Sequence, residues 1–157
     1  MSISIGQQAP DFTLFNTEKN KISLSDFKNK NVVLLFFPLA FTGVCTNELC
    51  NMRDNMAVYN GMNAEIIGIS VDSLFVLERF KKENNLDFPL LSDFNKTVSK
   101  SYGCLYDTFA FDMEGVSKRS AFVIDVAGNV QYAEVLESAG ELPNFEAIQK
   151  CLQSLQS

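Results

Sequence analysis

The 157-residue sequence contains no histidine and no tryptophan. Without histidine, the chain cannot build a Cys-His or Ser-His catalytic pair, a His-ligated haem site or most catalytic zinc sites. Any chemistry that the protein performs must therefore use other side chains.

Basic runs and long apolar runs are also missing. The net charge is −6, and the sequence contains no cluster of Lys and Arg. Because a phosphate backbone is bound by clustered positive charge, we expect no nucleic-acid partner. The longest apolar run, residues 32–41, is interrupted by Pro38 and is far shorter than the roughly 20 residues that span a bilayer. We therefore expect no membrane partner either.

Composition and length are those of an ordinary globular domain. Hydrophobic residues make up 46% of the chain and charged residues 20%. The first ten residues carry no basic side chain and no continuous apolar stretch, so no signal peptide is visible. We expect one domain over residues 1–157, located in the cytoplasm, where thiols are kept reduced.

Hydrophobic periodicity alternates between strand and helix along the chain. It predicts an N-terminal hairpin over 11–15 and 21–24, and further strands over 31–37, 65–71, 88–91, 120–125 and 130–136. It predicts helices over 42–59, from Ser73 as N-cap to about Asn84, over 95–102 and at the C-terminus. One stripe of the first helix contains Cys45, Leu49, Met52, Met56 and Tyr59; one face of the last contains Phe145, Ile148, Leu152 and Leu155. This order favours a layered α/β fold.

The four cysteines, Cys45, Cys50, Cys104 and Cys151, include no C-x-x-C pair. The missing C-x-x-C motif argues against a thiol–disulfide oxidoreductase, although the α/β order is compatible with a thioredoxin-like fold. Four widely spaced cysteines without histidine are also a poor ligand set, so we expect no metal and no cofactor.

Cys45 has the most informative position of the four. It follows a buried strand and a tight turn over residues 41–44, and it lies in the first turn of the predicted helix. Unpaired backbone N–H groups and the positive end of the helix dipole favour a thiolate there. A lone cysteine can equally be a small buried hydrophobic residue, so its neighbours decide.

The residues around Cys45 follow a known pattern. Pro38, Thr42 and Cys45 match P-x-x-x-T-x-x-C, and the sequence resembles the peroxiredoxin family. The opening Ala9-Pro-Asp-Phe12 is similar to that of family members, as is Glu48 three residues after the cysteine. The segment 118–125, which contains Arg119, resembles the strand that carries the family's active-site arginine. The resemblance implies a thioredoxin-like fold with an N-terminal β-hairpin extension and a central mixed sheet flanked by helices.

The resemblance also implies a role for each of these residues. Cys45 would be the peroxidatic cysteine, which reduces a hydroperoxide and becomes a sulfenic acid. Thr42 would hydrogen-bond to thiolate and peroxide, or cap the helix, or do both. Arg119, which alone would suggest a surface salt bridge, would stabilise the thiolate and the polarised O–O bond. Pro38 would end the strand and shield the sulfur. Glu48 would either orient Arg119 or be an exposed helix charge.

The second half of the reaction is left open by the sequence. The spacing of Cys45 and Cys50 resembles the Q-type peroxiredoxins, also called bacterioferritin comigratory proteins, and implies that Cys50 is the resolving residue. The sequence of residues 41–45 resembles that of the AhpE-like group, whose members often lack this second cysteine, so that an external thiol resolves the sulfenic acid. Cys104 is a weaker candidate, and Cys151 is interpreted as packing. The expected partners are a hydroperoxide and a thioredoxin- or glutaredoxin-like reductant, and the protein would be a monomer or a homodimer.

Two further alternatives remain beside the thiol–disulfide oxidoreductase. A glutathione-peroxidase-like enzyme is disfavoured because the tryptophan that usually supports its sulfur is missing. A peroxide sensor or holdase-like binding protein would react once at Cys45, whereas an enzyme would turn over with a reductant.

Overall fold

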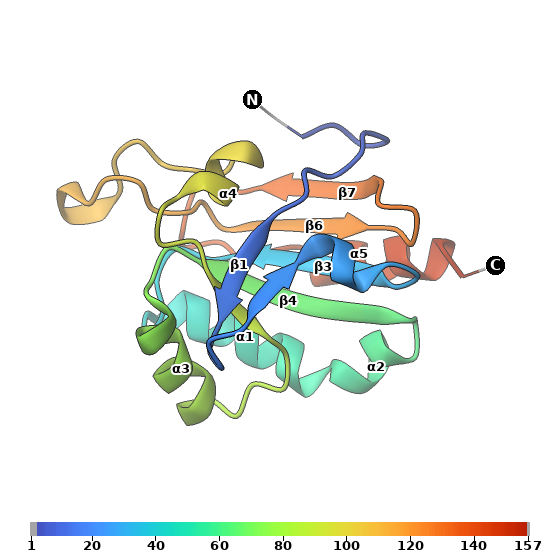
Figure 1. Cartoon of the computed structure of the whole chain (residues 1–157), viewed down its shortest axis with the longest axis horizontal. Coiled ribbons are helices and arrows are strands. Elements are labelled where there is room, and N and C mark those ends of the chain that lie inside the picture. Colours follow the sequence, from blue (N-terminus) through green and yellow to red (C-terminus); the bar gives the residue numbers. More distant parts are fainter. Residues whose placement is uncertain (1–2, 157) are drawn as a thin grey trace.

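The computed structural model describes residues 3–156, which form a mixed seven-stranded sheet with helices on both faces (Figure 1). The strands are β1 (Thr13–Asn16), β2 (Lys21–Ser23), β3 (Asn31–Phe36), β4 (Ala64–Ser70), β5 (Leu90–Ser92), β6 (Ser120–Ile124) and β7 (Val130–Val135). The helices are α1 (Gly43–Asp54), α2 (Met56–Asn60), α3 (Leu74–Glu83), α4 (Thr97–Ser101) and α5 (Phe145–Ser154), with 3₁₀ turns at Leu24–Phe27 and Ala110–Asp112.

The sheet order is β2-β1-β5-β4-β3-β6-β7. Strands β3, β4 and β5 are parallel neighbours, while β6 pairs antiparallel with β3 and with β7. The hairpin of β1 and β2 joins the sheet antiparallel to β5 and extends it at that edge. The predicted hairpin extension and the mixed central sheet are therefore confirmed.

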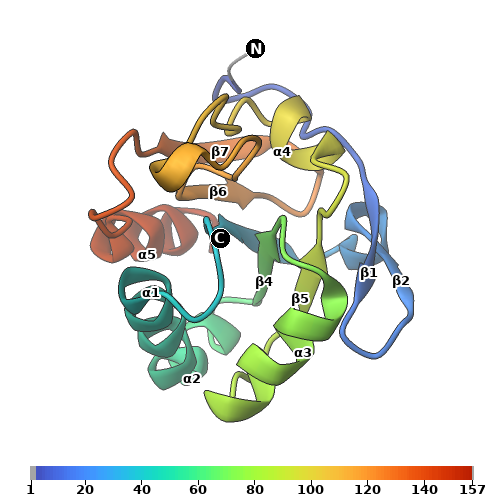
Figure 2. The same cartoon turned by 90° about the vertical axis from the view of Figure 1, so that its left-hand side faces the viewer.

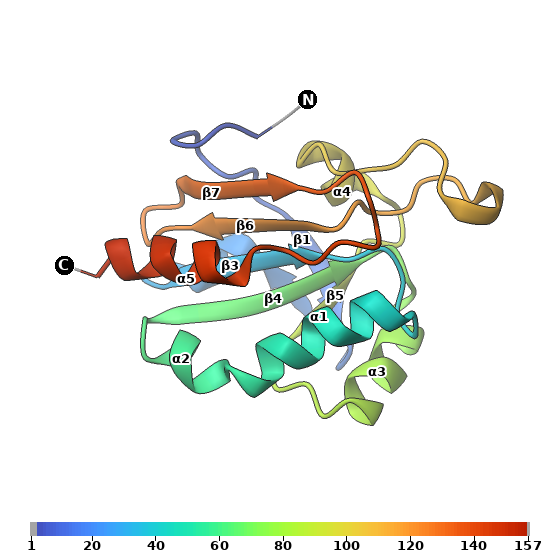
Figure 3. The ribbon, with the colours of Figure 1, turned by 180° about the vertical axis from the view of Figure 1, so that it is seen from behind.

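Strand β3 divides the core into two halves because all of its residues are buried. Val33 and Leu35 face a cluster that includes side chains of α1, α2, α3 and α5. Val32, Leu34 and Phe36 face a second cluster, which includes side chains of α4 and of the N-terminal segment. Alternate residues of a strand point to opposite faces, so these are the two sides of the sheet. Figures 2 and 3 show α1, α2, α3 and α5 on one side.

The predicted helix over 42–59 is divided in the structure. Asn55 has the non-helical angles φ −110° and ψ 15°, and it separates α1 from α2. Its side-chain amide donates to the carbonyl of Asn51 at 2.8 Å, so a short polar side chain binds the backbone where the helix ends. Tyr59 of the predicted stripe is nevertheless buried in the same cluster as Cys45.

Other element ends differ by a few residues from the sequence prediction. Helix α4 begins only at Thr97, because Lys96 has a left-handed φ of 68° that the α-helix cannot include. Ser73 caps α3 as predicted, since its hydroxyl accepts a hydrogen bond from the Val76 N–H. Within residues 3–156, no helix is both long enough and apolar enough to cross a membrane.

Candidate active site

The topology brings Cys45, Glu48 and Arg119 to one end of the sheet. After β3 the chain passes the buried Pro38, turns, and enters α1 at Gly43, so Cys45 lies in its first turn. Glu48 is one helical turn further along the same face. Strand β6 runs antiparallel to β3 with Ser120 opposite Phe36, which places the preceding Arg119 at the end of β3 that leads to α1.

Arg119 and Glu48 form a buried ion pair. Nη1 of Arg119 lies 2.6 Å from Oε1 of Glu48, and their side chains are 2% and 0% exposed. Nη2 of Arg119 donates to the carbonyl oxygen of Ala139 at 3.0 Å. The alternatives of an exposed helix charge for Glu48 and a surface salt bridge for Arg119 are therefore wrong. Nη1 of Arg119 thus donates a charge-assisted hydrogen bond to Glu48.

Burial and charge act in opposite directions on this pair. Burial raises the pKa of Glu48 to about 7, although Arg119 opposes that change. Burial alone would lower the pKa of Arg119, but the attraction of Glu48 and of the Cys45 sulfur outweighs it and the pKa is raised. Arg119 therefore lies close enough to the Cys45 sulfur for their charges to interact. Arg119 is a permanent positive charge near the sulfur.

The turn before α1 leaves the helix start without a side-chain cap. Thr42 is at the N-cap position with extended backbone angles, but its hydroxyl makes no capping bond. The hydroxyl instead donates to the carbonyl of Leu39 at 2.8 Å. The capping alternative for Thr42 is therefore wrong for its side chain. Unpaired N–H groups of a first helical turn can bind an anion or a polar oxygen.

Cys50 lies on α1 with Cys45 but makes different contacts. It is half-buried, and its sulfur is 3.7 Å from Oδ1 of Asn84 at the C-terminal end of α3. Arg53 also reaches Asn84, donating to its carbonyl oxygen at 2.5 Å. Cys50 therefore faces α3, and no disulfide links it to Cys45 in this structure.

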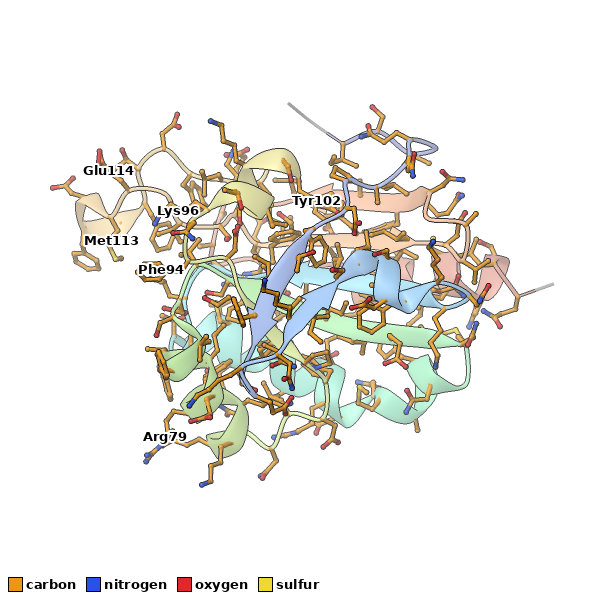
Figure 4. All side chains as sticks on the ribbon, viewed as in Figure 1. Arg79, Phe94, Lys96, Tyr102, Met113 and Glu114 are labelled. Carbon is orange, nitrogen blue, oxygen red and sulfur yellow. The ribbon has the colours of Figure 1, made fainter. Side chains whose placement is uncertain are left out.

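Cys104 and Cys151 lie away from the candidate site. Cys104 is buried in the cluster on the opposite face of the sheet from Cys45, beside Tyr102, which Figure 4 labels. Burial raises the pKa of Cys104 to about 12. Cys151 is half-buried on α5, packs against the core on the Cys45 side and is close to the carbonyl of Gln131. The interpretation of Cys151 as packing agrees with these contacts.

Two contacts of the site were missed by the sequence prediction. The carbonyl of Ala139 is a main-chain group in a loop and has no sequence signal. Asp72 accepts a hydrogen bond from the Ala40 N–H at 2.7 Å, in the turn that leads to Thr42. A signal for Asp72 did exist, because it directly follows a buried parallel strand, and the carboxyl ends of neighbouring parallel strands meet at one edge of the sheet.

Known proteins are similar to this chain in sequence and in fold. Residues 5–133 match the model of the AhpC/TSA family. The chain belongs to the AhpC/TSA family. A peroxiredoxin named bcp from Coxiella burnetii is 41% identical over 130 residues, which cover 82% of this chain and 85% of the relative. Alkyl hydroperoxide reductase E of Mycobacterium bovis is 34% identical and covers 89% of this chain and 90% of the relative.

Solved structures agree with the sequence relatives. The crystal structure of the peroxidoxin BcpB from Mycobacterium tuberculosis has a TM-score of 0.87, with 29% identity and 99% of both chains covered. The resemblance to the Q-type and AhpE-like peroxiredoxins, and with it the thioredoxin-like fold, is confirmed. As a member of the AhpC/TSA family, the protein is a thiol-dependent peroxidase that uses a peroxide and a thiol reductant.

Proposed function

We propose that Cys45 is the peroxidatic cysteine of this enzyme. The observation that carries the proposal is the position of its sulfur, buried at the uncapped start of α1 at the same end of the sheet as Arg119, which Glu48 holds at 2.6 Å. A thiolate in this position faces a fixed positive charge and the positive end of a helix dipole. Cys45 is also protected from bulk water, since its exposed fraction is 0%.

The oxidation step transfers one oxygen atom to Cys45. Its thiolate attacks one oxygen of the hydroperoxide, so that an S–O bond forms while the O–O bond breaks. Cys45 is oxidised to a sulfenic acid, and the peroxide is reduced to water or an alcohol, which leaves after taking up a proton. The Nε–H of Arg119 has no hydrogen-bond partner among residues 3–156 and is available to a peroxide oxygen. The proton of the Thr42 hydroxyl is donated to the Leu39 carbonyl, so its oxygen accepts a hydrogen bond from the hydroperoxide O–H. The first-turn N–H groups complete the donors around the reacting oxygens, and Pro38 shields the sulfur.

Both hydrogen peroxide and organic hydroperoxides fit this step. Only the O–O group has to reach Cys45, and the rest of the molecule can extend toward the exposed Thr42. The name of the mycobacterial relative, alkyl hydroperoxide reductase E, supports organic hydroperoxides as substrates of this chain also.

The resolving step is assigned to Cys50, with an external thiol as the alternative. Cys45 and Cys50 lie on one continuous helix, about 7.5 Å apart along its axis and about 140° apart around it. A disulfide needs Cα atoms within about 7 Å and side chains that face each other. The first turns of α1 must therefore unwind before the bond can form. Cys104 is a poor resolving residue because the sheet separates it from Cys45.

A disulfide made in this way would be presented at the surface by the unwound segment. A thioredoxin- or glutaredoxin-like protein is the proposed reductant, because such proteins attack exposed disulfides with a thiolate. The cytoplasmic location, the single domain and the choice between monomer and homodimer stay predictions from the sequence.

Substitution of single cysteines tests this assignment. Cys45→Ser should abolish peroxide consumption with a dithiol reductant, whereas Cys151→Ser should leave it unchanged, since the Cys151 thiol only packs against the core and the Gln131 carbonyl. Substantial peroxide consumption by the Cys45→Ser protein would refute the proposed mechanism. Intact mass after one equivalent of peroxide then separates the resolving routes: loss of two hydrogens means a disulfide, and gain of one oxygen means a persistent sulfenic acid.

A further inference from the structure

The turn between β3 and α1 has a strained conformation. Phe41 has a φ of 64°, in the left-handed region that side chains other than glycine rarely adopt. Its ring is 51% exposed, although its edge meets Phe80 of α3. Such a conformation persists only where the surrounding structure holds it in place. Here the turn is held at the neighbouring residue, Ala40.

Asp72, which lies between β4 and α3, is bonded to this turn. Its Oδ2 accepts a hydrogen bond of 2.7 Å from the backbone N–H of Ala40, directly before Phe41. The same oxygen is 3.0 Å from Oγ of Ser70, and the carbonyl of Asp72 accepts from Oγ of Ser92 at 2.6 Å. Asp72 is thereby fixed by the ends of two parallel strands, β4 and β5. Figure 3 shows the end of β4 and the start of α1 at the same end of the sheet.

These contacts form a chain from the rigid sheet to the reacting groups. The sheet holds Asp72, Asp72 holds the N–H of Ala40, and the carbonyl of Leu39 in the same turn accepts from the Thr42 hydroxyl. A hydrogen bond to an ionised carboxylate is shorter and stronger than one between neutral groups. Burial raises the pKa of Asp72, but the bonds from Ala40 and Ser70 oppose that change.

We propose that Asp72 is a positioning residue for peroxide reduction, which acts through the Ala40 N–H to set the turn that carries Pro38 and Thr42. The inference rests on the proposed function, because it assumes that peroxide reacts at Cys45 beside this turn. Asp72 itself does not enter the reaction. Its contribution is to keep the peroxide-binding groups of this turn in the geometry that the O–O bond requires.

Two reactions of the same sulfur separate positioning from general damage to the fold. Iodoacetamide, like peroxide, has to reach the buried Cys45 sulfur, and alkylation then requires only that the sulfur is a thiolate. Peroxide reduction also requires donors placed around both oxygens, and a displacement of about 1 Å can slow such a reaction about 100-fold. Loss of the Asp72 anchor should therefore affect the peroxide reaction far more than the alkylation.

The test compares Asp72→Ala with Asp72→Asn in the full-length protein. Both variants remove the charge, but only the asparagine retains an oxygen that can accept from the Ala40 N–H. We expect Asp72→Ala to slow the reaction with hydrogen peroxide about 10- to 100-fold and Asp72→Asn to slow it clearly less. Alkylation of Cys45 should change by less than about two-fold in both variants. Rates of peroxide loss and of iodoacetamide labelling at Cys45, followed by mass spectrometry, measure the two reactions.

Asp125→Ala is the matched control. Asp125 also anchors a turn, since it accepts from the N–H groups of Ala127 and Asn129, but it follows β6 at the opposite end of the sheet from Pro38. In Asp125→Ala, the rates of peroxide reduction and of iodoacetamide labelling at Cys45 should both equal those of the unaltered protein. Circular dichroism establishes that each variant is folded, and if Asp72→Ala does not fold, Asp72→Asn decides with an expected slowing of about three-fold or more in the peroxide reaction alone.

The inference is overturned if peroxide reduction is unchanged in every folded Asp72 variant, or if alkylation slows by the same factor as peroxide reduction. Failure of the inference and failure of the proposed function give different results. If Cys45→Ser still consumes peroxide, the proposed function fails whatever the Asp72 variants do. If Cys45→Ser is inactive and the Asp72 variants react normally, only the positioning role is lost.

Discussion

Replacing Glu48 by glutamine should remove one particular pH dependence of stability. Burial raises the pKa of Glu48 from the ordinary 4.5 to about 7 in the folded protein, against the pull of Arg119. The folded state therefore retains a proton that the unfolded chain releases between these values. The stability that Glu48 contributes is fully present below pH 4.5 and is lost as the pH rises through 7.

The size of this effect follows from the raised pKa. Each pKa unit corresponds to about 1.4 kcal/mol, so the shift amounts to about 3 kcal/mol, of which about 2 to 3 kcal/mol is lost between about pH 5 and pH 8. Solvent does not screen this effect, because the Glu48 side chain is 0% exposed. Glutamine keeps an oxygen that can accept from Arg119 but has no proton to release.

The measurement is the free energy of unfolding in urea, followed by circular dichroism in steps from about pH 5 to pH 8. The difference in free energy of unfolding between the unaltered protein and Glu48→Gln should change by about 2 to 3 kcal/mol across this range, with the unaltered protein favoured at the acidic end. Other titrating groups cancel in the difference. Glu65→Gln is the control, since Glu65 forms a partly exposed ion pair with Lys30 whose loss should cost less than about 1 kcal/mol.

A flat difference across this pH range would refute the reasoning. It would mean that Glu48 has the same pKa in the folded and unfolded protein, so that Arg119 compensates fully for burial. A difference of the opposite sign would mean that the ion pair outweighs burial and holds the folded-state pKa below the ordinary value.

Three more predictions concern the reactivity of the thiols. Arg119→Met should slow both peroxide reduction and iodoacetamide labelling of Cys45, because in a chain without histidine only Lys or Arg supplies the positive charge; unchanged rates of both reactions would remove Arg119 from its role. Oxidation should increase hydrogen exchange across residues 43–54 but not across 64–70, because α1 must unwind for an internal disulfide; equal exchange in both segments, or peptide mapping without that disulfide, would favour the external thiol. Cys104, whose pKa burial raises to about 12, should stay unlabelled by iodoacetamide in the folded protein at pH 8 because almost none of it is thiolate there, and labelling at the rate of a free thiol would contradict the raised pKa.

Local pattern was sufficient to predict the elements and the position of the reactive sulfur. Continuous apolar residues over 32–37 predicted a strand buried on both faces, and the change to helical spacing after Thr42 placed Cys45 in a first helical turn. The hydroxyl of Ser73 marked the start of α3. These features depend on residues within a few positions of one another, which is the range over which propensity and capping act. The single helix predicted over 42–59 was wrong at Asn55 because a side-chain bond to the backbone interrupted a continuous apolar stripe.

The environment of each charged and sulfur-containing side chain was decided only by the tertiary structure. Glu48 could have been an exposed helix charge, and it became a buried partner of Arg119 because β6 pairs antiparallel with β3. Cys104 was separated from Cys45 by the sheet, which no spacing along the chain could indicate. The physical reason is the same in each case. Burial, pKa and hydrogen-bond partners depend on residues distant in sequence, such as Asp72 and Ala40, and pairing of the strands is what brings those residues together.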